Sequence, residues 1–123
     1  MKTALVIEDN ADNMELITFM LERNGYRTLK AETGQQGIEM ALSAFPDFII
    51  LDIQLPDMDG VEVLRKIRGS KVDGTIPVIA MTSHAMAGDR EKLLDAGCTG
   101  YIEKPIDPQA VIRQIQQALG EDS

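Results

Sequence analysis

Short apolar runs alternate with longer segments of helical periodicity along the whole chain, and this alternation restricts the fold more than any other feature. The runs that predict strands are Ala4–Ile7, Thr28–Ala31, Phe48–Leu51, Val78–Met81 and Tyr101–Ile102. The segments that predict helices are Ala11–Asn24, Gly34–Ala44, Asp59–Arg68, Ala87–Ala96 and Pro108–Leu119. Five successive strand–helix units predict an α/β fold, in which right-handed crossovers connect a doubly wound parallel sheet.

Residues typical of helix ends support this division. Capping residues stand where three helices should start: Asn10, Thr33 with Gln36 at capping-box spacing, and Asp107 before Pro108. Gly25 and Gly97 follow two helical stretches, where a C-terminal cap uses glycine. The last helix carries one apolar stripe, formed by Val111, Ile115, Ala118 and Leu119. That stripe predicts a helix that packs on the sheet.

Length and charge exclude several classes of function. A chain of 123 residues suits one domain, and we expect residues 1–123 to form it without an output domain. A net charge of −8 opposes direct binding to nucleic acid or to an anionic membrane. Cys98 and His84 are the only residues of their types, which excludes an internal disulfide and a zinc cluster. No apolar run approaches the ~20 residues of a membrane span, so we expect a cytoplasmic protein.

The run Phe48–Leu51 is apolar at every position, which suits a strand covered by helices on both faces. Asp52 follows it directly, at the carboxyl end of the predicted strand. Open α/β sheets bind ligands just outside this edge, so Asp52 is a candidate ligand-binding residue. The alternative is an ordinary loop aspartate that accepts backbone hydrogen bonds.

Polar residues follow four of the predicted strands at the same edge: Glu8 with Asp9, Asp52, Thr82 and Lys104. In the common strand order 2-1-3-4-5, the first and third strands are neighbours at a crevice, which would bring the three acids together. Two carboxylates ~4 Å apart repel by about 4 kcal/mol, so the cluster needs a cation. Oxygen ligands beside a phosphate suit Mg²⁺.

Thr82 and Lys104 offer a hydroxyl and a positive charge, which suit a phosphoryl group. Each residue also has a simpler explanation when it is taken singly. The acids Glu8 and Asp9 can favour the start of a helix through its dipole, Thr82 can be an ordinary strand end, and Lys104 can be solvated. Because all of these residues are expected at the same edge of the sheet, a functional site is favoured.

These residues resemble the receiver domain of two-component response regulators over essentially the whole chain. The resemblance is carried by the acidic pair Glu8-Asp9, by Asp52 in LDIQLPDMDG, by Thr82 in PVIAMTSHAM, and by Tyr101 and Lys104-Pro105 in YIEKPI. It implies the flavodoxin-like (βα)5 fold with strand order 2-1-3-4-5. It also implies that Asp52 is phosphorylated by the phosphohistidine of a histidine kinase or a histidine phosphotransfer protein.

The resemblance further assigns a role to each site residue. Mg²⁺ would be held by Asp9, Asp52 and the backbone carbonyl of Gln54, with Glu8 reaching the ion through water. Lys104 would contact Asp52 or its phosphoryl oxygens. Many family members have aspartate where this chain has Glu8, which bears on metal affinity.

A conformational switch is also implied. On phosphorylation Thr82 would move toward the phosphoryl group, and Tyr101 would turn inward, although Tyr101 also suits a partly buried strand residue. The surface of the fourth and fifth helices, including Met86, Ile106 and Ala110, would then change toward a downstream protein target. Met86 and Ile106 could be partner contacts or core residues.

His84 and Gln54 stand at positions where side chains affect the lifetime of the phosphoryl group. Gly60 matches the loop glycine of the family, and Pro105 matches its usual cis proline.

We therefore expect a phosphorylation-dependent binding module, and not a conventional enzyme, that helps to catalyse its own phosphorylation and dephosphorylation. The segment HAMAGDREKLLDAGC resembles receivers of hybrid histidine kinases, so a receiver excised from a larger protein is an alternative. A second alternative is a scaffold of the same fold that is never phosphorylated.

Two other classes of protein are excluded, because the chain lacks residues that each of them requires. A phosphatase of the haloacid-dehalogenase type needs a second acid two residues after its nucleophile, where this chain has Gln54. A dinucleotide enzyme needs a glycine-rich loop after the first strand, where this chain has Glu8-Asp9-Asn10-Ala11.

Overall fold

The computed structural model describes residues 1–69, 76–83 and 87–121. Its strands are β1 (Thr3–Ile7), β2 (Arg27–Ala31), β3 (Phe48–Asp52), β4 (Val78–Thr82) and β5 (Gly100–Glu103). Its helices are α1 (Ala11–Arg23), α2 (Gly34–Ala44), α3 (Gly60–Arg68), α4 (Ala87–Asp95) and α5 (Val111–Ala118). Every predicted strand and helix is present, and only the start of α5 differs by more than one residue from the predicted bounds.

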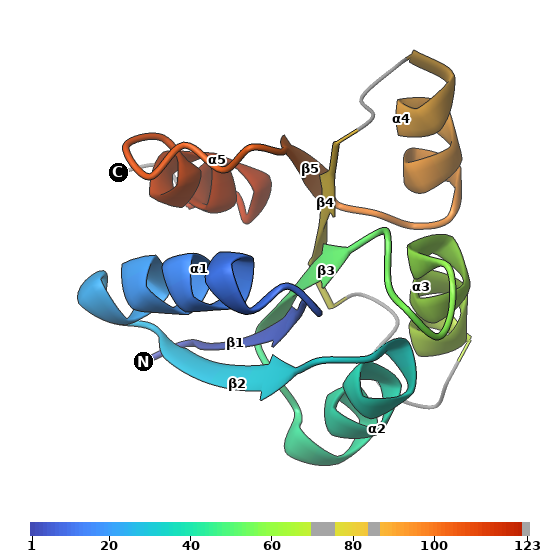
Figure 1. Ribbon diagram of the computed structural model, residues 1–123, viewed down its shortest axis with the longest axis horizontal. Helices are drawn as coiled ribbons and strands as arrows, with labels where there is room; N and C mark the ends of the chain where they lie inside the picture. Colours follow the sequence, from blue (N-terminus) through green and yellow to red (C-terminus); the bar gives the residue numbers. More distant parts are fainter. Residues whose placement is uncertain (70–75, 84–86, 122–123) are drawn as a thin grey trace.

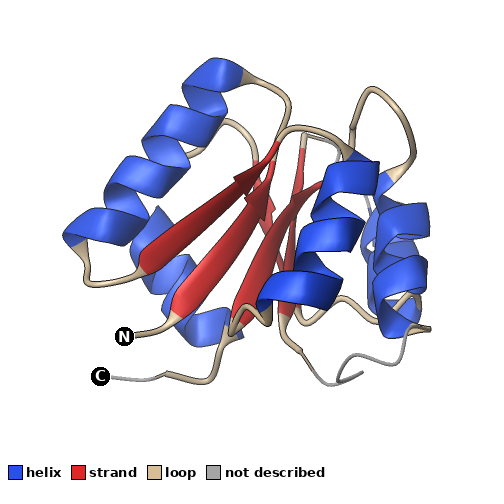
Figure 2. Ribbon diagram, turned by 90° about the horizontal axis from the view of Figure 1, so that it is seen from below, coloured by secondary structure: helices blue, strands red, loops and turns tan. Residues whose placement is uncertain are grey.

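The five strands form one parallel sheet in the order β2-β1-β3-β4-β5, which confirms the predicted doubly wound flavodoxin-like topology. Helices α1 and α5 lie on one face of the sheet, and α2, α3 and α4 lie on the other (Figure 1). All five strands run in the same direction, so their carboxyl ends meet at one edge (Figure 2).

The core lies in two layers, one on each side of the sheet, because successive residues of a strand point to opposite faces. Ile49 and Leu51 of β3 pack with α2, α3 and α4, whereas Phe48 and Ile50 pack with α1 and α5. Every residue of β3 is buried, including Asp52 at its end. The uninterrupted apolar sequence of β3 is explained by this double coverage.

Most of the predicted helix ends are confirmed. The side chain of Asn10 accepts a hydrogen bond from the Asn13 N–H, and Thr33 accepts one from the Gln36 N–H. Gly25 and Gly97 follow α1 and α4 with φ of 88° and 105°, the left-handed conformation that a C-terminal glycine cap requires.

The predicted start of the last helix at Pro108 is wrong. The side chain of Asp107 accepts the Gln109 N–H at 2.9 Å, and its carbonyl accepts the N–H groups of Ala110 and Val111. This local bonding holds residues 108–110 in a turn, and α5 begins at Val111. Its apolar stripe packs on the sheet as predicted.

Ile106 is buried in the core layer beneath α1 and α5, which decides between the two roles that the sequence left open for it. His84 and Met86 lie outside the described residues. None of the helices in the described part of the chain is long and apolar enough to cross a membrane.

Candidate functional site

Strand β3 delivers Asp52 to the carboxyl edge of the sheet. Asp52 is the last residue of this strand and lies opposite Met81 of β4, with 2% of its surface exposed. One of its carboxylate oxygens, Oδ1, accepts the N–H of Gln54 at 3.0 Å. The buried strand therefore fixes the backbone of Asp52, and the following turn fixes its carboxylate.

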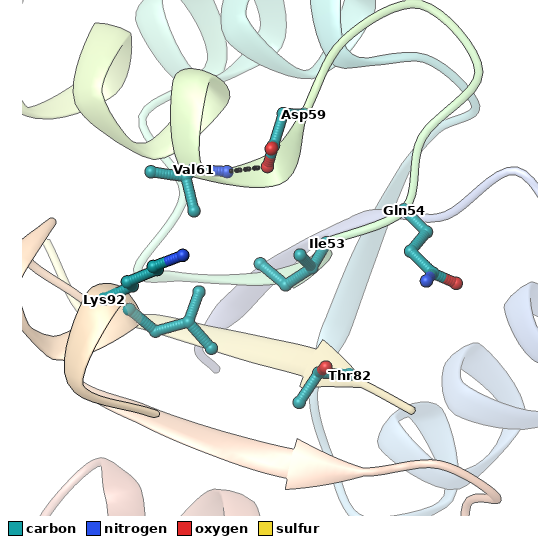
Figure 3. Close-up of a pocket in the computed structure, with 7 residues that line it drawn as sticks. Ile53, Gln54, Asp59, Val61, Thr82 and Lys92 are labelled. Carbon is teal, nitrogen blue, oxygen red and sulfur yellow. Dashed lines mark hydrogen bonds between the residues drawn. The ribbon is translucent and has the colours of Figure 1, made fainter. Parts of the chain in front are cut away.

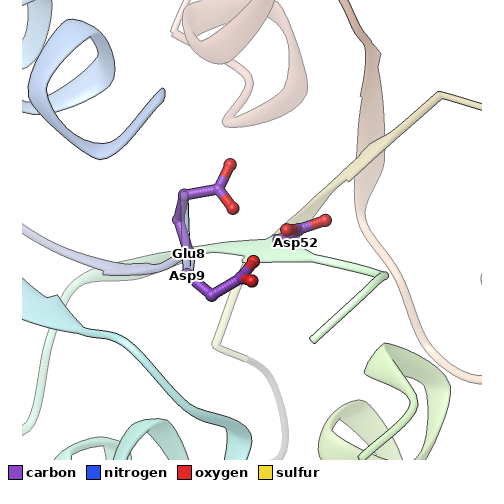
Figure 4. A group of neighbouring side chains, drawn as sticks. All are labelled: Glu8, Asp9 and Asp52. Carbon is purple, nitrogen blue, oxygen red and sulfur yellow. The ribbon is translucent and has the colours of Figure 1, made fainter. Parts of the chain in front are cut away.

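Strand β1 brings two further acids to the same edge. Glu8 follows the strand, its N–H donates to the Ala31 carbonyl of β2, and only 1% of its surface is exposed. Asp9 is exposed. One carboxylate oxygen from each of Glu8, Asp9 and Asp52 lies within 4.8 Å of the other two, so the three acids converge as the sequence predicted (Figure 4). Pairing between β1 and β3 produces this convergence.

Strand β5 places a lysine beside these carboxylates. The backbone N–H of Lys104 donates to the Thr82 carbonyl of β4, which continues the pairing of the two strands past their ends. The Nζ atom of Lys104 lies 3.0 Å from Oδ1 of Asp52 and 3.4 Å from Oε1 of Glu8. The peptide bond to Pro105 is cis, as the resemblance implied.

Burial and the charges of neighbouring groups shift the pKa values of Glu8 and Asp52 in opposite directions. Burial, and then the neighbouring Asp52 carboxylate, raise the pKa of Glu8 to about 7. Burial acts to raise the pKa of Asp52 as well, but the Glu8 carboxyl, the Gln54 N–H and the Lys104 ammonium together lower it. The pKa of Lys104 is raised, because Asp52 and Glu8 outweigh its burial. Asp52 therefore remains ionised more readily than Glu8.

The donor set fits a small divalent cation. The three carboxylates face one ammonium, so two negative charges remain unbalanced when all the acids are ionised. The Oε1 atom of Glu8 is buried without a hydrogen bond among the described residues, although it lies within ion-pair distance of Lys104. An all-oxygen site that combines buried and exposed carboxylates suits Mg²⁺ and its retained water molecules.

The loop after β3 closes on itself next to Asp52. The N–H of Gly60 donates to the Ile53 carbonyl at 2.9 Å, and Gln54 forms an isolated antiparallel bridge with Asp59. Asp59 caps α3 by accepting the Val61 N–H at 2.9 Å. Gln54, whose carbonyl was expected to be a metal ligand, therefore lies in a constrained segment.

Thr82 and Tyr101 occupy neighbouring strands. Thr82 ends β4 and is buried, and it borders a cavity of about 260 Å³ between the β3–α3 connection and α4 (Figure 3). The described residues that line this cavity are Ile53, Gln54, Asp59, Val61, Thr82, Lys92 and Leu93. Tyr101 of β5 lies opposite Ala80 of β4. Its side chain is half-buried and packs against the core layer of α2, α3 and α4.

Two features were not predicted from the sequence. Asp57 accepts hydrogen bonds from the first two N–H groups of α2, which lies more than twenty residues earlier in the chain. Phe45 ends α2 in the left-handed conformation, with φ of 50° and 74% of its surface exposed. No local pattern indicated the partner of Asp57, and a phenylalanine at this cap position runs against the usual preference for glycine.

Comparison with known proteins agrees with this geometry. The chain is 38% identical to the polar-differentiation response regulator DivK of Brucella ovis over 120 residues, which are 98% of each protein. It is 35% identical to the receiver domain of the sensor histidine kinase PA1611 from Pseudomonas aeruginosa, with a TM-score of 0.86 over 97% of this chain and 98% of that one. The crystal structure of that receiver domain has a magnesium ion coordinated in its active-site cleft.

A third comparison supports the fold alone. The chemotaxis response regulator CheY4 of Vibrio cholerae has a TM-score of 0.92 at 24% identity, over 96% of this chain and 98% of that one. Residues 4–116 match the family described as the response regulator receiver domain, and so include all four strand ends of the site. The chain therefore belongs to the response regulator receiver domain family, whose members are signalling proteins.

Proposed function

We propose that the chain accepts a phosphoryl group on Asp52 from a phosphohistidine, in a step that depends on Mg²⁺, and that phosphorylation changes which partner it binds. The donor is a histidine kinase or a histidine phosphotransfer protein, and the acceptor of the signal is a downstream protein. The observation that carries this proposal is the convergence of the three carboxylates within 4.8 Å, with the Lys104 ammonium 3.0 Å from Asp52.

The step is a displacement at phosphorus. A carboxylate oxygen of Asp52 attacks, a phosphorus–oxygen bond forms, and the phosphorus–nitrogen bond to the donor imidazole breaks with its electron pair leaving on nitrogen. The lowered pKa of Asp52 keeps this nucleophile ionised. Lys104, which pairs with Asp52 before the reaction, can follow the charge as it moves onto the phosphoryl oxygens.

The metal would be held by Asp9, Asp52 and the backbone carbonyl of Gln54, with Glu8 reaching it through water. When bound, Mg²⁺ neutralises negative charge between the carboxylates and the incoming phosphoryl group. Glu8 and Asp9 orient the site from the end of β1, and the hydrogen bond from Gln54 to Asp52 holds the nucleophile in place.

Signalling would then depend on Thr82 and Tyr101. Thr82 ends its strand close to the acidic edge and carries the hydroxyl that can donate to a phosphoryl oxygen. Tyr101 packs half-buried on the adjacent strand, so a shift of Thr82 changes the space beside it. We propose that this movement changes the surface around α4, β5 and α5.

Acetyl phosphate tests the chemistry without a cognate kinase. With Mg²⁺ we expect one acid-stable, base-labile phosphate on the parent protein and none on Asp52→Asn. The matched control is Asp47→Asn. Asp47 lies away from the acidic site, and its carboxylate accepts a hydrogen bond from the Thr3 N–H at 2.7 Å. Labelling that persists in Asp52→Asn would show that another residue is the nucleophile. A parent protein that is never labelled would favour the unphosphorylated scaffold.

A receiver that works within a hybrid histidine kinase is the second candidate, because the Pseudomonas structure at 35% identity is the receiver domain of a sensor histidine kinase. The phosphoryl chemistry is the same in both cases. Transfer rates from candidate donors, measured side by side, would distinguish a receiver supplied by its own kinase from one supplied by a separate protein. Loss of label over time, compared with the denatured phosphoprotein, would show whether the chain hydrolyses its own acyl phosphate.

A further inference from the structure

The segment between β3 and α3, residues 53–59, is held at two places; we call it the β3–α3 loop. At its base, the Gly60 N–H donates to the Ile53 carbonyl at 2.9 Å and Gln54 bridges to Asp59. The dashed bond in Figure 3 shows Asp59 capping the following helix. The base therefore lies directly beside Asp52.

The tip of the β3–α3 loop is bound to the first turn of α2. Oδ1 of Asp57 accepts the Gly34 N–H at 2.8 Å, and Oδ2 accepts the Gln35 N–H at 3.0 Å. The two oxygens of one carboxylate thus satisfy two N–H groups that have no partner within the helix. These bonds lower the pKa of Asp57, which is ionised at neutral pH.

Helix α2 gains negative charge at its N-terminal end from this distant carboxylate, in addition to that of Glu32, which precedes the Thr33 cap. Its own first turn contains no acidic residue. Thr33 caps only the third N–H, by accepting from Gln36 at 3.1 Å. Asp57 accepts from the first two N–H groups and supplies the negative charge that the N-terminal end of a helix dipole favours.

A second contact supports the same attachment. Met58 packs against the core layer of α2 and α3, and a Cβ atom at Gly34 would lie 2.5 Å from its Cγ. The absence of a side chain at Gly34 lets the loop approach the helix this closely. Polar and apolar contacts therefore hold adjacent residues of the loop tip on α2.

We propose that Asp57 is a positioning residue for the candidate magnesium site, because its attachment to α2 holds the β3–α3 loop that carries Gln54. The proposal rests on the proposed function, in which the Gln54 carbonyl is a metal ligand. With the base beside Asp52 and the tip on α2, the loop is fixed at both ends. Loss of the Asp57 bonds would leave only the packing of Met58 and the bonds at the base to hold the loop, and would let Gln54 move relative to Asp52.

The test compares Asp57→Asn with Asp57→Glu and with Asp47→Asn. Asparagine offers one acceptor oxygen and no charge, whereas glutamate retains the two acceptor oxygens and the negative charge. Asp47 is the matched control, since its carboxylate also caps a backbone N–H, that of Thr3, outside the acidic site. Calorimetric titration with MgCl₂ measures the metal, and amide hydrogen exchange at Gln54 and Gly60 in EDTA measures the loop without it.

We expect the Mg²⁺ dissociation constant to rise about 10-fold in Asp57→Asn, in the range typical of residues that orient metal ligands, and to be partly restored in Asp57→Glu. Exchange at Gly60 should accelerate in Asp57→Asn and stay unchanged in Asp47→Asn. Parental Mg²⁺ affinity and parental exchange in Asp57→Asn would overturn the proposal. An equal loss of affinity in Asp47→Asn would also overturn it, by showing a general effect of stability.

Failure of the proposed function gives a different result. If the parent protein takes up no Mg²⁺, the metal-dependent function is wrong whatever the variants do. The exchange measurements in EDTA then still show whether Asp57 holds the loop.

Discussion

The Nζ atom of Lys104 lies 3.0 Å from Oδ1 of Asp52, so the candidate nucleophile is paired with a cation before any phosphoryl group arrives. Glu8 shares the same ammonium at 3.4 Å. Lys104 is thus the counter-charge that allows buried carboxylates to be brought together at the end of a sheet.

Replacement of this lysine should destabilise the metal-free protein. Lys104→Met leaves Asp52 and Glu8 buried without a cation, and we expect the free energy of unfolding to fall by about 2 kcal/mol in EDTA. Mg²⁺ should restore part of the loss, since it supplies positive charge to the same carboxylates. Urea unfolding in EDTA and in MgCl₂ measures both effects.

Lys66→Met is the matched control for this experiment. Lys66 pairs with Glu62 at 3.8 Å, but about half of each side chain is exposed, at 52% and 54%. An exposed pair of this kind contributes under ~0.5 kcal/mol. A Lys104→Met protein as stable as Lys66→Met would contradict the role given to Lys104.

Stability without metal should fall as the pH rises toward neutrality. The pKa of Glu8 is raised from its ordinary value of 4.5 to about 7, so the folded state holds a proton that the unfolded state releases in this interval. Unfolding free energy should therefore decrease by on the order of 2 kcal/mol between pH ~4.5 and ~7 from this group. The pKa of Asp52 is lowered from its ordinary value of 3.8, so this group changes the unfolding free energy only at a pH below the interval in which Glu8 acts.

Glu8→Gln isolates this contribution. The variant has no proton to lose at position 8, so its unfolding free energy in EDTA should change less over the same pH interval than that of the parent. Denaturant titrations at several pH values give the two profiles. Parallel profiles for parent and variant would show that Glu8 does not titrate in this window.

Gly60→Ala should disturb the site through the backbone. A Cβ atom at this position would lie 2.5 Å from the Cα atom of Ile53 and 3.0 Å from the carbonyl oxygen of Asp52. Because backbone atoms cannot rotate away, we expect a loss of about 3 kcal/mol in unfolding free energy and weaker Mg²⁺ binding. Gly69→Ala, with its nearest atom at 3.3 Å, is a milder comparison. Wild-type stability in Gly60→Ala would show that the loop can relax.

Phe45→Asn should stabilise the protein. Phe45 has φ of 50°, a conformation that asparagine adopts more readily than phenylalanine, and it is 74% exposed, so little packing is lost. We expect a gain of about 1 kcal/mol, measured as a higher thermal midpoint. Phe19→Asn is the control, because Phe19 is exposed within α1, where asparagine has no such advantage. Destabilisation by Phe45→Asn would mean that the ring contributes more packing than its exposure indicates.

The strand order was expected from the common arrangement of such sheets and from the family resemblance. The sequence itself determined the strand–helix alternation and the residues that end each strand. These features are encoded locally, by apolar periodicity and by capping residues such as Asn10 and Thr33. The start of α5 was misplaced because a local Asp-Pro signal is compatible with both a helix cap and a turn. In the structure, the bonds of Asp107 form the turn.

Tertiary structure alone decided how these residues meet. The separation of Asp52 from Lys104, the raised pKa of Glu8 and the attachment of Asp57 to α2 all depend on groups that are distant in the chain. Hydrogen bonds and charge interactions act through space at short range, so their partners are set only when the sheet aligns its strands and the loops fold over it. A sequence pattern can therefore place an acid at an edge, but the packed sheet determines what that acid faces.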